Sequence, residues 1–234
     1  MTASSHHIPI NTRITFENDP LKWLEALDFV IAPQQKRSRR TLEQIIVAAM
    51  RLFVDRGFDQ TTIADIARYS DVSVGSIYQR FSDKSAILQT IVAGYRNTRI
   101  KEIQELGDKT RGSHHDAREV VEFHIDVIFS ALSGDKGILR LIETQRLTDE
   151  KTYFMLVEAN EQVSMLIFDL LKEHLPDRDA RELEAQVRYL HNIVRGSAVW
   201  TILPRFPAAP RSLDINDPRY RAEALVMALA YLDI

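Results

Sequence analysis

The chain has 234 residues, of which 45% are hydrophobic, enough for one large folded domain or two small ones. It contains no cysteine, so disulfides, zinc–thiolate sites and thiol catalysis are excluded. The net charge of −3 hides an asymmetry, because residues 36–101 carry 12 Lys/Arg and 6 Asp/Glu, whereas the remainder carries 18 and 27. A basic part within an acidic chain indicates that only this part meets a polyanion.

The N-terminal 20 residues lack the basic start and the apolar run of a signal peptide. No stretch approaches the roughly 18 uninterrupted apolar residues of a membrane span. We therefore expect a soluble, cytoplasmic protein with no membrane partner.

Gly and Pro are scarce, at 8 each, and apolar residues recur with helical spacing, so we expect an all-α fold. Residues 1–18 are predicted to be a polar arm. A short helix is predicted over 19–31, with Asp19 as its cap, Pro20 in its first turn and Pro33 beyond its end. Its apolar face would pack on its own subunit or on a neighbour, or the segment would serve as a DNA-side or regulatory arm.

A helix over 41–56 is predicted next, with Thr41 and Gln44 as a capping box and Gly57 as the residue that ends it. Two short helices follow, over 62–70 and over 74–81, the second capped by Ser73. Helices of this length do not bury a core alone. We therefore expect them to pack on the 41–56 helix as a compact three-helix head.

A long helix is predicted from residue 82 or 83 to Leu106, where Gly107 ends it; its roughly 24 residues would span about 36 Å. Further helices are predicted over 115–132, 136–147, 150–174, 179–203 and 219–233. The chain would thus divide into an N-terminal extension (residues 1–35), a head (36–83) and a larger helical domain (84–234).

The second short helix would present a tip of small residues, which can enter the major groove of DNA, about 12 Å wide. Cations, hydroxyls and free backbone N–H groups around the tip would contact phosphates. The candidate DNA contacts are Arg39, Arg40, Thr61, Thr62, Ser73, Val74, Gly75, Ser76, Tyr78, Gln79 and Lys84. The alternatives are a packing role for Tyr78, a solvated Lys84 and a solubilising linker for the basic run 36–40.

Residues 39–88 resemble the N-terminal pattern of the TetR family of bacterial regulators. The matching positions are Ala48-Ala49, Leu52-Phe53, Gly57-Phe58, Thr61-Thr62-Ile63, Ile66-Ala67, Val72-Ser73, Gly75-Ser76-Ile77-Tyr78, Phe81, Lys84 and Leu88. Two positions depart from the pattern: Ser70-Asp71 replaces Ala-Gly in the turn, and Ser85 replaces Glu. Because Asp tolerates a positive φ better than most residues, we expect the turn to form at a cost of about 1 kcal/mol.

The resemblance implies a helix-turn-helix head followed by a TetR-like helical domain for dimerisation and ligand binding. It implies a DNA-binding transcriptional regulator, expected to be a repressor that a small-molecule effector releases from its operator. A homodimer would place two heads about 34 Å apart on double-stranded, near-palindromic DNA.

The last two helices are predicted to carry the dimer interface. Residues 222–232 are apolar nearly all round, and such a helix is buried against a partner subunit or within an intrachain core. The candidate interface residues are Gly196, Ala198, Trp200, Ala224, Leu225, Ala228 and Leu229.

An effector pocket would lie among the middle helices, with apolar lining and a few polar anchors. The candidates are Tyr95, Phe123, His124, Ile128, Ile142, Phe154, Glu158, Met165, Tyr189, His191 and Asn192. The long helix would link this pocket to the head, so that a ligand shifts the population of DNA-competent dimers. We expect no cofactor and no metal, because the adjacent pairs His6-His7 and His114-His115 lack further ligands.

Two alternatives stay open at this point. A constitutive or protein-controlled DNA binder would have a closed core with no cavity, and an activator leaves no signature that separates it from a repressor. An enzyme is not expected, because the chain shows no Gly-rich phosphate loop, nucleophile motif or metal-ligand spacing.

Overall fold

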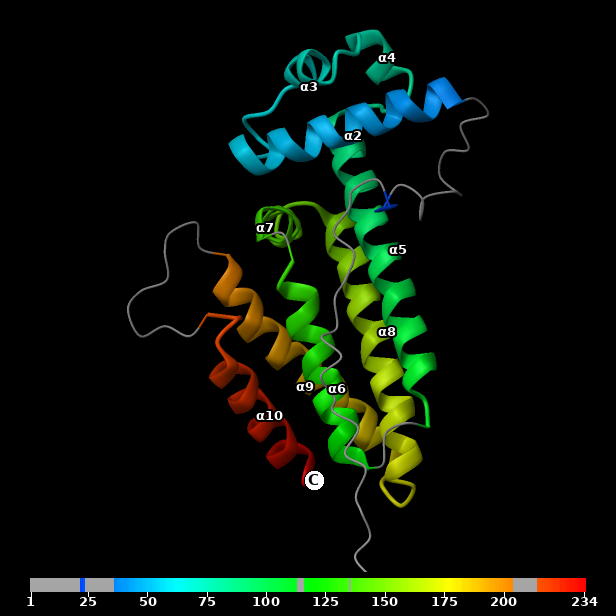
Figure 1. The fold of residues 1–234 in the computed structure, drawn as a ribbon, viewed down its shortest axis with the longest axis vertical. Coiled ribbons are helices and arrows are strands. Elements are labelled where there is room, and N and C mark those ends of the chain that lie inside the picture. The colour runs from blue at the N-terminus through cyan, green and yellow to red at the C-terminus, as the bar shows by residue number, and fades with distance from the viewer. Residues whose placement is uncertain (1–21, 24–35, 113–115, 135, 204–213) are drawn as a thin grey trace, which may run out of the picture.

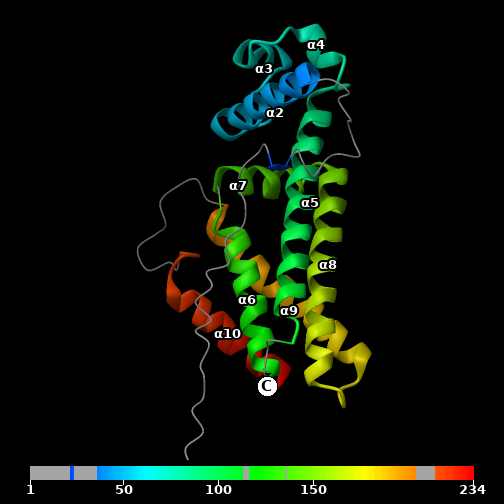
Figure 2. The same ribbon diagram turned by 45° about the vertical axis from the view of Figure 1, so that its right-hand side comes forward.

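The computed structural model describes residues 22–23, 36–112, 116–134, 136–203 and 214–234. Within these ranges the regular structure is helical, which confirms the expected all-α fold. An upright bundle carries a smaller group of helices across one end (Figures 1 and 2). None of the described helices is both long enough and apolar enough to cross a bilayer. In chain order the elements are α2 (Lys36–Arg56), α3 (Ile63–Ser70), α4 (Val74–Tyr78), α5 (Lys84–Thr110), α6 (Ala117–Leu132), α7 (Lys136–Gln145), α8 (Glu150–His174), α9 (Ala180–Ile202) and α10 (Pro218–Leu232).

Helices α2, α3 and α4 form the head, with α2 lying across the end of the bundle (Figure 1). Its centre is a fully buried cluster that includes Phe53, Ile66 and Ile77. This core continues past the boundary predicted after residue 83. The contributors from α5 and α7 are Ile87, Leu88, Ile91, Val92, Ile138, Leu141 and Ile142. The head is therefore packed on the bundle through one continuous apolar core.

Capping side chains explain where the short helices begin. Thr62 caps α3 in a capping box with Asp65, Ser73 caps α4, and Asp83 caps α5. The hydrogen bonds from Thr62 hold the pKa of the Asp65 carboxyl below its usual value. The predicted starts of these helices are confirmed to within two residues.

Helix α2 begins earlier than expected. It starts at Lys36, so Thr41 lies inside the helix and the predicted capping box with Gln44 is wrong. Lys and Arg are good helix formers, and the basic run 36–40 is able to continue the helix toward the N-terminus.

Helix α5 continues through Gly107 to Thr110, so the predicted end at Leu106 is wrong. A Cβ atom at Gly107 would lie 2.9 Å from Cδ2 of Leu166 on α8. The glycine therefore marks a close approach of two long helices and not a helix end.

Two residues of the N-terminal extension are described, Lys22 and Trp23, and both are helical. Trp23 is only 3% exposed, and its ring centroid lies 5.3 Å from that of Tyr95 on α5, edge to face. Gly94 leaves room for this contact, since a Cβ atom there would lie 2.8 Å from the carbonyl oxygen of Trp23. The rest of the predicted helix over 19–31 lies outside the described residues.

The bundle has a second apolar core, to which α6, α8, α9 and α10 all contribute, and α10 packs on α6 and α9. Five of the predicted dimer-interface residues are buried in this core: Ala198, Ala224, Leu225, Ala228 and Leu229. For these five the prediction is wrong, and the intrachain alternative is correct. The small and apolar stripe of α10 faces its own chain, which the nearly uniform composition of the helix concealed.

Candidate nucleic-acid interface and bundle cavity

A left-handed residue closes the turn between α3 and α4. Asp71 has φ 56° and ψ 37°, and its N–H donates to the carbonyl oxygen of Ala67. The buried hydroxyl of Ser70 donates to the carbonyl oxygen of Ile66 at 2.7 Å. The expected positive φ at Asp71 is confirmed, so Ser70 and Asp71 form the turn without a glycine.

The first turn of α4 is open to solvent. The cap Ser73 accepts the N–H of Ser76 at 3.1 Å, and the two hydroxyl oxygens lie 2.9 Å apart. Gly75 is exposed, with no atom within 4 Å of the place where a Cβ would be. Packing of the chain therefore does not require a glycine, which costs a helix about 1 kcal/mol relative to alanine. A glycine at this tip fits the close approach of a second molecule.

The rest of α4 divides into an inner and an outer side. Ile77 is fully buried, whereas Tyr78 is 55% exposed and Val74 and Gln79 are exposed as well. The helix is thus anchored in the head by its inner side and presents the predicted contact residues on its outer side.

The two threonines before α3 have different environments. Thr61 is buried, and its hydroxyl donates to the carbonyl oxygens of Gly57 at 2.8 Å and Leu52 at 3.3 Å. The expectation that the Thr61 side chain contacts DNA is therefore wrong, because this residue closes the loop after α2. Thr62 is exposed and engaged as a cap. The N–H groups of the first turn of α3 have no acceptor within the helix, so a phosphate contact there stays a prediction.

Lys84, at the start of α5, has an internal role that the sequence did not indicate. Its Nζ donates to the carbonyl oxygen of Phe58 at 2.6 Å and lies 4.3 Å from the centroid of the Phe58 ring. This contact ties α5 to the loop between α2 and α3. An ammonium group has three donors, so a phosphate contact by Lys84 also stays a prediction.

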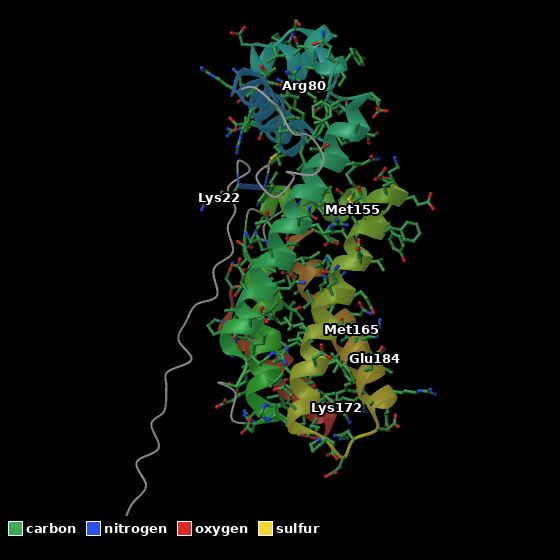
Figure 3. All side chains as sticks on the ribbon, turned by 90° about the vertical axis from the view of Figure 1, so that its right-hand side faces the viewer. Lys22, Arg80, Met155, Met165, Lys172 and Glu184 are labelled. Carbon is green, nitrogen blue, oxygen red and sulfur yellow. The ribbon has the colours of Figure 1, made fainter. Side chains whose placement is uncertain are left out.

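The head also carries arginines on α2 and directly after α4. Arg39 and Arg40 are exposed, and Nε of Arg39 lies 3.1 Å from a carboxylate oxygen of Glu43, an exposed pair of a kind that contributes little to stability. Arg80, which sequence reasoning passed over, lies in the head (Figure 3). It ties α4 to α2 by donating to the carbonyl oxygen of Ser76 at 2.9 Å and to Oγ of Ser38 at 3.3 Å.

A mostly apolar cavity of about 80 Å³, here called the bundle cavity, lies between α5, α6, α8 and α9. Its volume is that of two or three water molecules. Three of the predicted pocket residues line it: Tyr95, Ile128 and His191.

Three arginines that sequence reasoning missed also line the bundle cavity: Arg96, Arg99 and Arg195. A signal for two of them was present. Arg99 follows Tyr95 by four residues, and Arg195 follows His191 by four, so each shares a helix face with a predicted pocket residue.

The other predicted pocket residues do not line the bundle cavity. Phe123 and His124 are core residues, Ile142 belongs to the head core, and Tyr189 and Asn192 are exposed. Phe154 and Glu158 border a more open hollow between α5 and α8. Met165, on α8 (Figure 3), lies against Arg188. Helical spacing identifies residues that share a face, but it does not show which face meets a cavity.

A pair of buried histidines lies beside the cavity. Nε2 of His124 lies 3.0 Å from Nδ1 of His191, and Nε2 of His191 lies 3.4 Å from Oδ1 of Asn160. Burial lowers the pKa of His124 to about 4. Burial, the neighbouring His124 and Arg195 lower the pKa of His191 well below its usual value. Both rings are therefore neutral near pH 7 and add no charge to the cavity wall.

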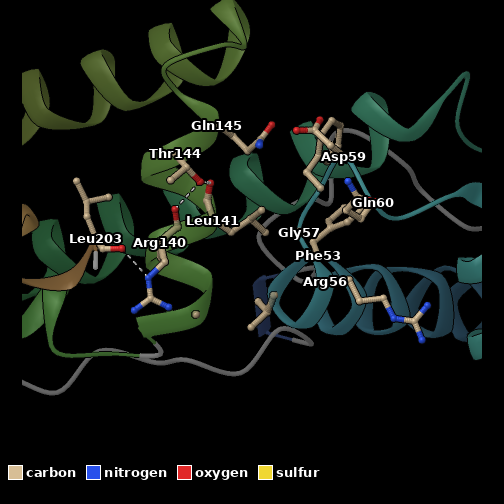
Figure 4. Close-up of a pocket in the computed structure, with 13 residues that line it drawn as sticks. Phe53, Arg56, Gly57, Asp59, Gln60, Arg140, Leu141, Thr144, Gln145 and Leu203 are labelled. Atoms are coloured by element: carbon tan, nitrogen blue, oxygen red, sulfur yellow. Dashed lines mark hydrogen bonds between the residues drawn. The ribbon is translucent and has the colours of Figure 1, made fainter. Parts of the chain in front are cut away.

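A larger and more polar cleft of about 380 Å³, here called the head–α7 cleft, separates the loop after α2 from α7 (Figure 4). Arg56 and Asp59 line it from the head, and Thr144 and Gln145 line it from α7. Arg140 of α7 donates from Nε to the carbonyl oxygen of Leu203, 2.9 Å away at the end of α9. Helix α7 is thus placed between the head and α9.

Apolar side chains are exposed on one face of α9 and α10. Trp200 is 76% exposed, and Gly196 is exposed on the same helix. The rings of Tyr189 and Tyr231 lie 5.6 Å apart, which shows that the two helices share this face. The other exposed apolar residues on the two helices are Ile193, Val226 and Met227.

Known proteins share both the head and the fold. Residues 45–91 match the family model described as bacterial regulatory proteins, tetR family. The HTH-type transcriptional repressor KstR2 of Mycolicibacterium smegmatis (strain ATCC 700084 / mc(2)155) is 23% identical over 201 residues, which are 82% of this chain and 92% of KstR2.

Solved structures of regulators agree with the fold. A TetR-family regulator from Mesorhizobium loti MAFF303099 superposes with a TM-score of 0.61 at 18% identity, covering 84% of this chain and 98% of the other. A transcriptional regulator from Saccharomonospora viridis in complex with choline superposes with a TM-score of 0.56 at 19% identity, covering 81% and 95%. The family match lies on the head and the likeness of fold extends over the bundle, so the chain carries a DNA-binding head of the tetR family on a bundle with the fold of solved transcriptional regulators.

Proposed function

We propose that this protein is a homodimeric repressor that binds near-palindromic operator DNA and leaves it when a small molecule binds in the bundle. The observation that carries the DNA-binding part is the open tip of α4. Gly75 has no packing neighbour there, Ser73 caps the helix, and Ile77 anchors it to the head. A short helix of this kind, with small residues at its leading end, suits insertion into the major groove.

The exposed face of α9 and α10 supports the dimer. Trp200, Tyr231 and Met227 are exposed apolar side chains of α9 and α10. Such a surface is typical of a protein–protein interface. A two-fold axis through this face would pair it with itself and orient two heads toward one duplex.

The bundle cavity supports the effector. It lies between four helices, is mostly apolar and has polar side chains at its wall, as small-molecule sites do. The regulator from Saccharomonospora viridis is in complex with choline, and KstR2 is a repressor. A constitutive DNA binder would need no such cavity.

Selection of bound duplexes from a random pool tests the DNA-binding proposal. We expect enrichment of a near-palindrome whose half-sites lie about one helical turn apart, centre to centre. Equal binding of the enriched duplex and of competitor DNA at low ionic strength would contradict the proposal. In vitro transcription from a promoter that overlaps the enriched site distinguishes repression from activation.

Analytical ultracentrifugation tests the dimer. Trp200→Glu is expected to shift the protein toward the monomer, because it places a charge in the apolar face. Leu147→Glu is the matched control, since Leu147 is also exposed but lies between α7 and α8. A dimer that withstands Trp200→Glu as well as it withstands Leu147→Glu would exclude this face as the interface.

A further inference from the structure

The wall of the bundle cavity carries cations and no carboxylate. Arg96, Arg99 and Arg195 line it, and no Asp or Glu is among the described residues that do so. All three arginine side chains are mostly buried. The remaining wall is largely apolar, and His191 is neutral there. A ligand with an apolar body and one negative charge fits this wall, whereas a cation would meet three guanidinium groups.

Each of these arginines is held by a carboxylate that lies outside the cavity lining. Arg96 pairs with Glu158 at 2.7 Å and Arg99 with Glu102 at 2.8 Å. Arg195 pairs with Glu143. The last pair differs from the other two because Glu143 is itself only 3% exposed, whereas Glu158 is largely exposed.

The pair between Arg195 and Glu143 connects α9 to α7. Glu143 also accepts from Nε of Arg146 at 2.6 Å, but both of these residues belong to α7. Loss of the contact with Arg195 would therefore leave Glu143 with a partner and still release the C-terminal half of α7 from α9. The N-terminal half of α7 keeps its own connection to α9 through Arg140 and Leu203.

The released half of α7 makes several of the contacts between α7 and the head. Leu141 and Ile142, the neighbours of Glu143, belong to the head core. Thr144 and Gln145 line the head–α7 cleft opposite the loop after α2 (Figure 4). A change in the position of this half of α7 would thus change the surface on which the head packs.

We propose that the effector is a small apolar monocarboxylate, and that it acts by drawing Arg195 away from Glu143, which loosens α7 and with it the head. This inference rests on the proposed function and names its ligand class and its relay. Because the cavity holds only about 80 Å³ in this structure, a ligand must widen it, and a shift of Arg195 is one way to do so. The carboxylate replaces Glu143 as the charge partner, so no guanidinium is left buried and unpaired.

Binding of sodium hexanoate to the full-length protein, measured by titration calorimetry and thermal shift, tests the ligand class without DNA. Hexanamide is the matched probe, since it has the same apolar body and no charge. We expect hexanoate to bind at least about tenfold more tightly than hexanamide. Equal binding of the two probes, or binding of neither, would overturn the ligand class.

Three variants test the relay. Arg195→Gln should weaken hexanoate binding by about tenfold or more, and Arg195→Lys, which keeps the charge, by less. Glu143→Gln should tighten it several-fold, since the internal competitor for Arg195 is removed. Glu158→Gln is the control and should change it by less than about twofold, because Glu158 is exposed. If Glu143→Gln instead weakened binding in parallel with Arg195→Gln, the pair would be part of the cavity frame and the relay would be excluded.

Operator affinity separates this inference from the proposed function. Without any probe, Glu143→Gln should bind the selected duplex more weakly than the native protein, and Glu158→Gln should bind it equally well. Unchanged operator affinity in Glu143→Gln would overturn the relay. Failure of every form to prefer any duplex, with the preference for hexanoate over hexanamide intact, would overturn the proposed function and leave the ligand class standing.

Discussion

In the head, the starts of the short helices and the turn between them are set by contacts between residues that are close in sequence, whereas the cavity wall of the bundle is set by contacts between residues far apart in the chain. Thr62 with Asp65 and Ser73 with Ser76 are three residues apart, and the turn at Asp71 closes onto Ala67. In the bundle, Arg195 meets Glu143, 52 residues away, and His124 meets His191, 67 residues away. Local contacts therefore specify where the helices proposed to meet DNA begin, and only the assembled fold specifies the cavity proposed to hold the effector.

The largest expected effect separates packing from contact within α4. Ile77→Ala removes a fully buried side chain and should lower the free energy of unfolding by about 2–5 kcal/mol. Val74→Ala, on the exposed side of the same helix, should change it by less than about 0.5 kcal/mol. Urea unfolding followed by circular dichroism at fixed protein concentration measures both. Similar losses for the two variants would show that α4 has no distinct inner and outer side.

The next effect belongs to the bundle and depends on pH. Burial lowers the pKa of His124 to about 4. Between about pH 6.5 and pH 4 the unfolded chain binds this proton and the folded chain does not, so stability falls as the pH falls, by about 3 kcal/mol over the whole window. His191, whose pKa is lowered as well, acts in the same direction.

Unfolding free energies at pH 7.5 and pH 5 measure this effect. The variant His124→Phe keeps a buried ring and removes one titrating group, so its stability should change less between the two values of pH. An equal change in the native protein and the variant would show that His124 is accessible to protons in the folded state.

A smaller effect tests whether Gly75 serves DNA binding or the stability of the fold. Gly75→Ala should leave the free energy of unfolding unchanged or raise it by up to about 1 kcal/mol, because the position is open and helical. The same change should weaken operator binding by about tenfold, because a methyl group then lies between the helix tip and the groove floor. Fluorescence anisotropy with labelled operator gives the affinity. Undiminished affinity would mean that the tip does not approach the bases.

The smallest effect concerns the joint between the two regions. If Lys84 contacts a phosphate, Lys84→Ala should reduce the slope of log affinity against log salt by about one unit. Loss of the contact with Phe58 should also lower thermal stability. A lower melting temperature with an unchanged salt slope would show that Lys84 serves only the internal contact.

The same difference between local and distant contacts decides what the sequence could predict. The starts of α3, α4 and α5 were predictable, because their caps Thr62, Ser73 and Asp83 are local signals, whereas α4 ends at Tyr78, three residues before its predicted end. The positive φ of Asp71 was predictable for the same reason. Gly107 was misleading as a helix end, because a glycine is needed there for the close approach of Leu166 on α8, and no local pattern reveals that contact.

The side chains around the two sites were predicted less well. Thr61 was expected at the DNA surface, but acceptors nine and four residues earlier, on Leu52 and Gly57, hold its hydroxyl inside the head. Ala224 and Ala228 were expected in the dimer interface, but α6 and α9 cover them. Arg195 shares a helix face with His191, but a charged residue is expected in solvent unless a partner such as Glu143 is known, and that partner lies 52 residues away.

The contact of Trp23 with Gly94 makes the environment of this tryptophan unlike that of Trp200. The chain has two tryptophans, and one, Trp23, is shielded against α5 while the other, Trp200, is open to solvent. In the monomer, their emission should therefore separate into a blue component that iodide cannot quench and a red component that it can. A dimer formed through the face of Trp200 would shield the red component as well. Replacing Trp200 with phenylalanine would leave a signal that reports only whether the N-terminal segment stays on α5.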